Sequence, residues 1–224
     1  LNIDKLLLND LDIGRWSAHL APTNSGYGVS NIKGKIAQTD VSGEMVWANK
    51  KGVAKSIVDV VATGGDFGAV LKQFGQSRVL ENKSGVLKAH LSWPGSPWSF
   101  EQGKLDGSLE LDIKNGRIIE AGTSASFLRI FGILNLNTVI KRLKLDFFDL
   151  LKSGVAFDKV SAKYRLEKGL ATSEAPLKLE GDAASIEMKG SINLQNGALA
   201  NRMQVAIPLT SNAPIAALFL ATPQ

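Results

Sequence analysis

Apolar and polar residues alternate with a period of two over much of the chain. From Gly103 to Ile113 the odd positions are mostly leucine or isoleucine, whereas the even positions are lysine, aspartate, serine and glutamate. Successive side chains of a β-strand point to opposite faces, so this pattern predicts a strand with one apolar and one polar face. The same alternation recurs over 86–93, 164–166, 184–194 and 202–209. The chain is therefore expected to be mainly β.

Short turn signals separate these runs. Asn115-Gly116 and Asn196-Gly197 are dipeptides typical of tight hairpins. Lys168-Gly169 and Lys51-Gly52 are weaker signals of the same kind. Strands joined by tight turns pair antiparallel, because parallel neighbours need a long crossover connection. The sequence thus predicts an antiparallel meander.

Glycines recur inside the predicted strands. A loose repeat places a glycine before alternating apolar residues at Gly43, Gly85, Gly107 and Gly190. A glycine inside a strand weakens it but permits a bend or a bulge. The repeat therefore predicts a long sheet that curls along its length, like a folded taco, into a β-groove.

Two segments break the β pattern. Residues 66–75 place apolar side chains at helical spacing between Asp66, a candidate N-cap, and Gly75, a candidate stop, which predicts a short helix. Residues 124–152 mix many apolar residues with a few cations, which predicts an amphipathic helical insert. No clear domain boundary is visible, so residues 1–224 are expected to form a single β-groove module that carries this insert.

The helical insert admits two interpretations. Packed on the sheet, it would close one end of the core. Alternatively, its apolar face and its cations would lie on an anionic lipid surface. The candidate membrane-surface residues are Phe127, Phe131, Lys141, Arg142 and Lys144.

Composition narrows the classes of function. The chain has no cysteine, which excludes disulfides and thiolate metal sites. Its net charge of +5 is scattered, with few aromatic residues among the cations, and this argues against nucleic acid as a partner. No apolar run approaches the roughly 20 residues of a membrane-spanning helix. Because the sequence does not begin with methionine, we interpret it as a segment of a longer protein.

Catalytic motifs are sparse. The two histidines are His19 and His90, and His90 falls on the polar side of its predicted strand, where a surface role is expected. Asp106, Glu110 and Asp112 share the polar side of the next strand, which indicates a solvated face. A glycan hydrolase would instead need a polar cleft with two carboxylates roughly 5 to 10 Å apart. The sequence predicts a protein that is not an enzyme and needs no cofactor or metal.

The segment Trp93-Pro94-Gly95-Ser96-Pro97-Trp98 is a stiff turn, because each proline fixes its own φ and Pro94 cannot donate to a sheet. A rigid corner with one buried indole is the favoured interpretation. The alternative is an aromatic contact with lipid or with a partner at the end of the sheet.

The order of these elements resembles a known family. The Trp-Pro-Gly-Ser-Pro turn at 93–97 leads into the glycine-containing strand at 105–111, then the basic insert, then Leu-Lys-Leu-Asp-Phe at 143–147. Upstream, Gly65 to Leu71 fits the same pattern. The chain is similar over essentially its whole length to the C-terminal region of the YhdP branch of the AsmA-like envelope proteins, relatives of TamB. The turn and the Leu-x-Leu-Asp-Phe element are the specific parts of this resemblance.

The resemblance implies both a location and a function. Such proteins are anchored in the inner membrane by an N-terminal helix and extend a β-groove across the periplasm of Gram-negative bacteria. The groove is expected to shield phospholipid on its way to the outer membrane, and this chain would form the distal part of that bridge. Phospholipid is then the expected partner, together with the outer membrane or one of its proteins.

An apolar groove suits this role, because each methylene exposed to water costs roughly 0.8 kcal/mol. If the groove were instead filled by its own side chains, the alternative would be a scaffold that binds an outer-membrane partner. The residues expected to line the groove are Leu87, Leu91, Trp93, Leu109, Leu111, Ile113, Tyr164, Leu166, Ile186, Met188, Ile192, Val205 and Ile207.

Overall fold

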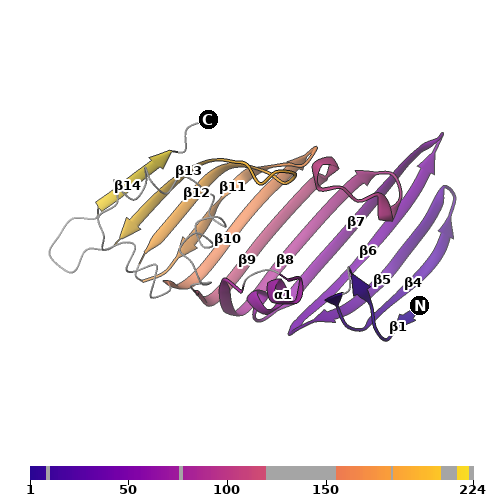
Figure 1. Cartoon of the computed structure of the whole chain (residues 1–224), viewed down its shortest axis with the longest axis horizontal. Helices are drawn as coiled ribbons and strands as arrows, with labels where there is room; N and C mark the ends of the chain where they lie inside the picture. The colour runs from indigo at the N-terminus through magenta and orange to yellow at the C-terminus, as the bar shows by residue number, and fades with distance from the viewer. Residues whose placement is uncertain (9–10, 76–77, 120–154, 183, 208–215, 222–224) are drawn as a thin grey trace.

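The strands of this protein form one long, open, curved sheet (Figure 1). The computed structural model describes residues 1–8, 11–75, 78–119, 155–182, 184–207 and 216–221. Twelve strands pair antiparallel in the order β1-β4-β5-β6-β7-β8-β9-β10-β11-β12-β13-β14, and β2 pairs with β3 in a separate two-stranded sheet. From β4 onward each strand lies beside its neighbour in sequence, which confirms the predicted mainly-β meander.

The strands run across the long axis of the molecule, so their ends form its two long rims (Figure 1). The elements are β1 (Asn2–Ile3), β2 (Leu7–Leu8), β3 (Leu11–Asp12), β4 (Trp16–Thr23), β5 (Gly26–Ile36), β6 (Thr39–Lys50), β7 (Val53–Gly64), α1 (Phe67–Gln73), β8 (Leu80–Pro94), the 3₁₀ turns η1 (Pro97–Ser99) and η2 (Gln102–Lys104), β9 (Asp106–Ile118), β10 (Val155–Glu167), β11 (Leu170–Glu180), β12 (Ser185–Asn193), β13 (Leu199–Ile207) and β14 (Ala216–Ala221).

One predicted hairpin is wrong. Strand β9 continues through Asn115 and Gly116 to Ile118 instead of turning. Asn115 has a φ of +52° and interrupts the regular pairing with β10. The left-handed conformation reverses the alternation of side chains at this point, while the register with β8 and β10 stays the same on both sides of Asn115. Ile113 and Ile118 therefore join the same buried cluster despite their odd spacing.

The other three turn signals are confirmed, at 51–52, 168–169 and 194–198.

Helix α1 confirms the predicted short helix and covers part of one rim. The Asp66 carboxylate accepts a hydrogen bond from the Ala69 N–H at 3.0 Å, which caps the first turn. Phe67 packs on the sheet at Gly85, where an added Cβ would lie 2.5 Å from the phenyl ring. No helix among the described residues is long and apolar enough to cross a membrane.

Close approach of neighbouring strands explains two of the repeated glycines. A Cβ at Gly43 would lie 2.2 Å from the Asp59 carbonyl oxygen, and one at Gly107 would lie 1.9 Å from the His90 carbonyl oxygen. Gly107 also has a φ of +137°, which L-residues rarely adopt. The curvature of the sheet therefore depends on the absence of a side chain at these positions.

The predicted insert at 124–152, with its candidate membrane-surface residues, lies outside the described residues. The division of the whole chain into a single module with one insert stays a prediction.

Candidate functional site

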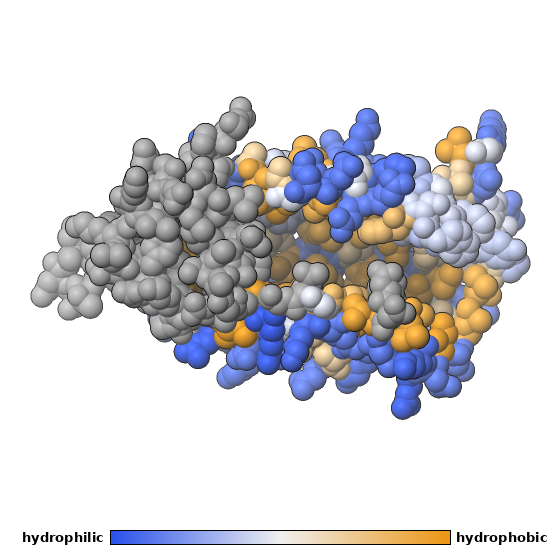
Figure 2. Space-filling model, in the orientation of Figure 1, coloured by the Kyte–Doolittle hydropathy of each residue, from blue (hydrophilic) through white to orange (hydrophobic). Residues whose placement is uncertain are grey.

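The inner face of the sheet forms a trough that runs along the long axis of the molecule. Figure 2 shows it from its open side, with hydrophobic residues in the hollow and many hydrophilic residues along both rims. Helix α1 lies at one rim, and the η1–η2 segment between β8 and β9 lies at the other (Figure 1). Both rims therefore rise over the same apolar face.

Strand register shows that the floor of the trough is continuous. Cross-strand partners share one face of a sheet, so a row can be followed from strand to strand across the molecule. One row crosses eight strands from β6 to β13, through Met45, Val58, Leu91, Gly107, Leu166, Ala171, Ile192 and Leu199. A second row crosses β6 to β10 through Val41, Ala62, Leu87, Leu111 and Ala162.

The register places twelve of the thirteen predicted groove residues on this one face. Their accessibility differs along the trough, however. Six are half-buried: Leu87, Leu91, Leu109, Leu111, Tyr164 and Ile192. Six are buried: Trp93, Ile113, Leu166, Ile186, Met188 and Val205. The last, Ile207, pairs with Ala216 at the β13–β14 edge, and its side chain lies outside the described part of the structure.

The trough is more tightly packed toward its C-terminal strands. In β11 to β13 the floor residues Leu179, Met188 and Val205 are 0%, 1% and 2% exposed. In β6 to β8 the floor residues Met45, Val58 and Leu91 are only half-buried. Contact of any of these side chains with a ligand stays a prediction, and the accessible floor lies mainly between β6 and β10.

Sequence reasoning missed the part of the floor that comes from β6 and β7. Val58, Val60 and Ala62 face the trough there. Ile57 and Val61 lie on the outer face but are also apolar. Because both faces of β7 carry apolar residues, period-two alternation is not visible in this strand. The apolar run at 57–62 was a signal for a strand, but it could not indicate which residues face inward.

The corner after β8 is rigid, as favoured for the Trp-Pro turn. The Trp93 indole is 5% exposed, donates its Nε1–H to the Ser96 carbonyl at 3.0 Å, and meets Phe100 edge-on at 5.4 Å between ring centroids. Trp98 is different, since it is 82% exposed. Its ring centroid lies 6.0 Å from that of Trp47, which in turn stacks on Tyr27 at 6.0 Å.

The outer face of the sheet is polar and carries cross-strand ion pairs. Lys88 pairs with Glu110 at 3.6 Å, and Lys159 pairs with Asp112 at 3.0 Å. His90, as expected for a surface residue, lies on this face and contacts Asp59 with its Nδ1 at 2.6 Å. Charged pairs at exposed positions contribute little stability, but they keep this face in water. The sheet thus has one polar, solvent-exposed face and one apolar face.

Two pKa shifts follow from these surroundings. Hydrogen bonds from Arg165 and Lys163 lower the pKa of the Glu174 carboxyl on the outer face. Burial raises the pKa of the Tyr164 hydroxyl on the inner face. The first stabilises a charge on the water-facing side, and the second disfavours a charge inside the trough.

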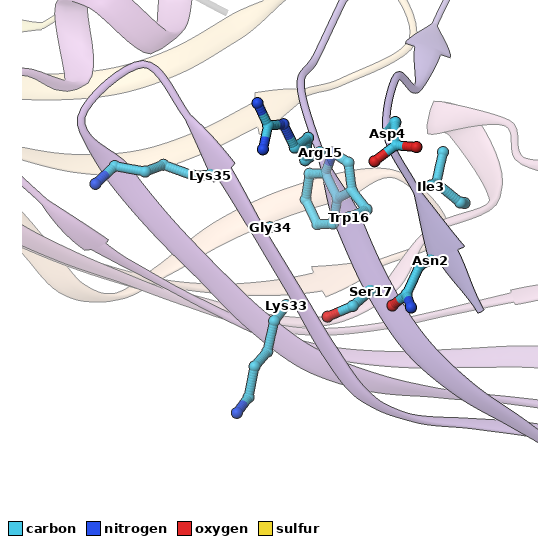
Figure 3. Close-up of a pocket in the computed structure, with 9 residues that line it drawn as sticks. All are labelled: Asn2, Ile3, Asp4, Arg15, Trp16, Ser17, Lys33, Gly34 and Lys35. Carbon is cyan, nitrogen blue, oxygen red and sulfur yellow. The ribbon is translucent and has the colours of Figure 1, made fainter.

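A shallow pocket of about 370 Å³ lies at the N-terminal end of the sheet, between β1, β4 and β5 (Figure 3). The Trp16 ring covers Gly34, where an added Cβ would lie 2.4 Å from ring carbons. Arg15, Lys33 and Lys35 are at its edge, but their side chains point in different directions (Figure 3). The pocket therefore does not bring these three cations to one point.

Comparison with known proteins identifies the family. Residues 1–224 match the family described as YhdP protein. This chain belongs to the YhdP family.

A relative in Escherichia coli (strain K12), the intermembrane phospholipid transporter YhdP, is 25% identical over 177 residues. The match covers 79% of this chain but only 14% of that relative's length. No solved structure gives a significant match.

In the described part of this segment, few side chains other than those of the apolar face are arranged as a binding or reactive site. Among the described residues, no group of three or more histidine, cysteine, aspartate or glutamate side chains could hold a metal ion. The carboxylates Asp106, Glu110 and Asp112 lie on the outer face, where Asp106 accepts the Lys168 N–H at 2.8 Å and the other two are ion-paired. What the arrangement can do is cover hydrocarbon.

Proposed function

We propose that this chain shields the acyl chains of phospholipids in its apolar trough, as the distal segment of a bridge between the inner and outer membranes. The observation that carries the proposal is the floor: rows of apolar side chains cross the sheet between two raised rims, yet Met45, Val58 and Leu91 remain half-buried. The proposal needs no catalytic step and no cofactor.

The energetics favour a hydrocarbon ligand on this floor. An apolar sheet face gains about 25 cal/mol for each Å² that is removed from water, and most sheets achieve this by packing against a second layer. Half-buried floor residues such as Val60, Ala89 and Leu109 still have apolar surface to cover. An acyl chain lying in the trough would cover it, and would itself avoid the cost of exposure to water.

The dimensions are also suitable. Neighbouring strands lie about 4.8 Å apart, so twelve strands make a trough roughly 50 Å long. One leaflet of a bilayer is about 15 Å thick in its hydrocarbon region. The trough is therefore long enough for a whole acyl chain to lie along it, with room for movement from one stretch of floor to the next.

Location and partners follow from the same proposal. The relative in Escherichia coli is named an intermembrane phospholipid transporter. We infer that this chain belongs to a protein anchored in the inner membrane of a Gram-negative bacterium, that it works in the periplasm, and that phospholipid is its cargo. The outer membrane, or a protein in it, would receive the lipid.

Site-specific photo-crosslinking tests the proposal. A benzophenone amino acid at Leu109, in the floor, should form phospholipid adducts when the purified chain is equilibrated with phospholipid vesicles, irradiated and examined by mass spectrometry. The matched control is Glu110, the next residue, which lies on the outer face and should give no lipid adduct. Leu91 provides a second floor position.

Absence of lipid adducts at both Leu109 and Leu91 would refute lipid shielding. Adducts to protein alone at these positions would instead support the scaffold alternative, in which the trough holds a protein partner. A lipid adduct at Leu91 but not at Leu109 would count against Leu109 as a lining residue.

A further inference from the structure

An exposed group of aromatic side chains stands on the rim that carries η1. We call it the aromatic lip and define it as Tyr27, Trp47 and Trp98. The Tyr27 and Trp47 rings stack with an interplanar angle of 16°, and Trp98 tilts against Trp47 at 57°. Tyr27 is 47% exposed and Trp98 is 82% exposed. So much aromatic surface in water is costly, unless a ligand covers it.

The central ring of the lip has an unused hydrogen-bond donor. The Nε1–H of Trp47 is buried and has no acceptor in the described part of the structure. A buried donor without a partner costs about 1–3 kcal/mol. In contrast, the Trp93 indole, at the same rim, has the Ser96 carbonyl as its acceptor. Because the Trp47 nitrogen is itself buried, a ligand oxygen would reach it only if the neighbouring rings of the lip moved apart.

Two cations without acidic partners lie at the rim where the lip's strand ends: Lys50, whose side chain starts from the outer face because it is three residues from Trp47, and Lys51 in the turn. Strand β6 continues from Trp47 to Lys50, and Lys51 follows in the tight turn to β7, within about 10 Å along the strand. Neither lysine forms an ion pair with any described residue. The opposite rim carries paired cations, Lys35 with Asp40 at 3.7 Å and Arg78 with Asp66 at 2.5 Å, beside Lys83 and Lys114, which pair with no described residue. Unpaired lysines thus lie at both rims, but at this rim they coincide with the exposed aromatic rings of the lip.

The lip is also adjacent to the apolar floor. Trp47 and Met45 lie on the same face of β6, and their partners on β7 are Ser56 and Val58. A ligand that fits this arrangement has an apolar tail for the floor, polar oxygens at the level of the indole rings, and a negative charge for the lysines. These are the features of a glycerophospholipid at its acyl, ester and phosphate levels.

We propose that the aromatic lip, together with Lys50 and Lys51, binds the ester and phosphate region of a phospholipid whose acyl chains lie in the trough. The proposal rests on the proposed function and adds a headgroup contact to it. Amphipathic aromatic rings suit the boundary between hydrocarbon and water. Lysine side chains reach from such a boundary to a phosphate, which they bind as point charges. The two rims then differ in role, and the lipid has a defined orientation across the trough.

A competition between two lipids tests this assignment. The purified chain is equilibrated with vesicles that contain phosphatidylglycerol and diacylglycerol with identical acyl chains, and the bound lipids are quantified by mass spectrometry. The wild-type chain should prefer the phospholipid by about fivefold, the effect expected of two exposed ion pairs. The double variant Lys50→Gln/Lys51→Gln should lose this preference but still bind diacylglycerol.

Trp98→Ala should lower the amount of phospholipid retained by the chain, whereas Trp98→Tyr should restore it.

The control removes two other unpaired lysines. Lys83 and Lys114 are exposed and lie on β8 and β9 near the opposite rim. The variant Lys83→Gln/Lys114→Gln has the same net charge as the lip variant and should keep the wild-type preference. This comparison separates a local headgroup contact from a general effect of charge.

The outcomes distinguish the two proposals. If the wild-type chain binds neither lipid, lipid shielding itself fails. If it binds both without preference, or if the preference survives Lys50→Gln/Lys51→Gln, the headgroup contact is wrong while the trough proposal stands. Excess inorganic phosphate should leave the preference unchanged, and its loss would indicate a site for free anions and overturn the lipid assignment.

Discussion

Individual glycines allow this sheet to curve into a trough. At Gly43 and Gly107 the backbone of the adjacent strand occupies the space that a Cβ would need. A residue with a side chain would push the strands apart at that point and flatten the trough. The apolar residues of the floor therefore depend on glycine to be held on a concave surface rather than a flat one.

Gly43→Ala should destabilise the protein by about 1–3 kcal/mol, because the new methyl group would overlap the Asp59 carbonyl oxygen. Gly28→Ala is the matched control, since its Cβ would lie at an ordinary 3.4 Å from the Thr23 side chain. The control should be neutral or stabilising by up to about 1 kcal/mol, because alanine restricts the unfolded chain. Urea unfolding followed by far-UV circular dichroism measures both. Equal stability of the two variants would contradict this account of the curvature.

At the scale of elements, α1 shows how a short helix is held at a rim. Seven residues are too few for a stable isolated helix, so its stability comes from its cap and its packing. Asp66 caps the first turn and also pairs with Arg78, while Phe67 covers Gly85. The helix thus closes the floor beside β8 without filling the trough.

Asp66→Ala should weaken α1 by about 1 kcal/mol through loss of the cap. The expected result is an increase of about fivefold in the hydrogen exchange rate of the Ala69 amide, whose N–H the Asp66 carboxylate accepts. Asp66→Asn should retain most of the protection, because asparagine caps helices and tolerates the positive φ of 52° at this position. Unchanged exchange in Asp66→Ala would show that packing alone holds the helix.

For the whole molecule, the decisive property is that the two faces of one sheet differ. Ion pairs such as Lys88–Glu110 and Lys159–Asp112 keep the outer face wet, while the inner face is apolar from β6 to β13. Lipid that moves along the trough would have to pass every strand of the floor. A single charge in its accessible stretch should therefore interrupt the path.

Val60→Asp should reduce the phospholipid retained by the purified chain by about tenfold, because a carboxylate in the floor is poorly solvated beside an acyl chain. Val61→Asp places the same charge one residue further, on the outer face, where Val61 is 38% exposed. This control should retain lipid within about twofold of the wild type. Lipid extraction and mass spectrometry give the comparison, and similar losses in both variants would indicate a general effect on folding.

Much of the architecture was predictable from the sequence, because it depends on local patterns. Alternation at 103–113 and 184–194 predicts strands through the two-residue period of β structure. Tight turns at Asn196-Gly197 and Lys168-Gly169 then impose antiparallel neighbours. The same patterns place twelve of the thirteen predicted groove residues on one face, since register in a meander follows from the turns.

Other features were decided only by the tertiary structure. Asn115-Gly116 is a dipeptide typical of hairpins, but the residues on either side of Asn115 pair with β8 and β10 in unchanged register, so the strand continues. Pairing with β6 and β8 decides which residues of β7 face the trough. Alternation cannot indicate this, because the adjacent residues Ile57 and Val58 are both apolar. The difference between Trp93, buried, and Trp98, exposed, arises from contacts with Ser96 and Trp47. Local sequence determines which residues can form a strand, but pairing between distant strands decides where each side chain points and whether it meets protein or water.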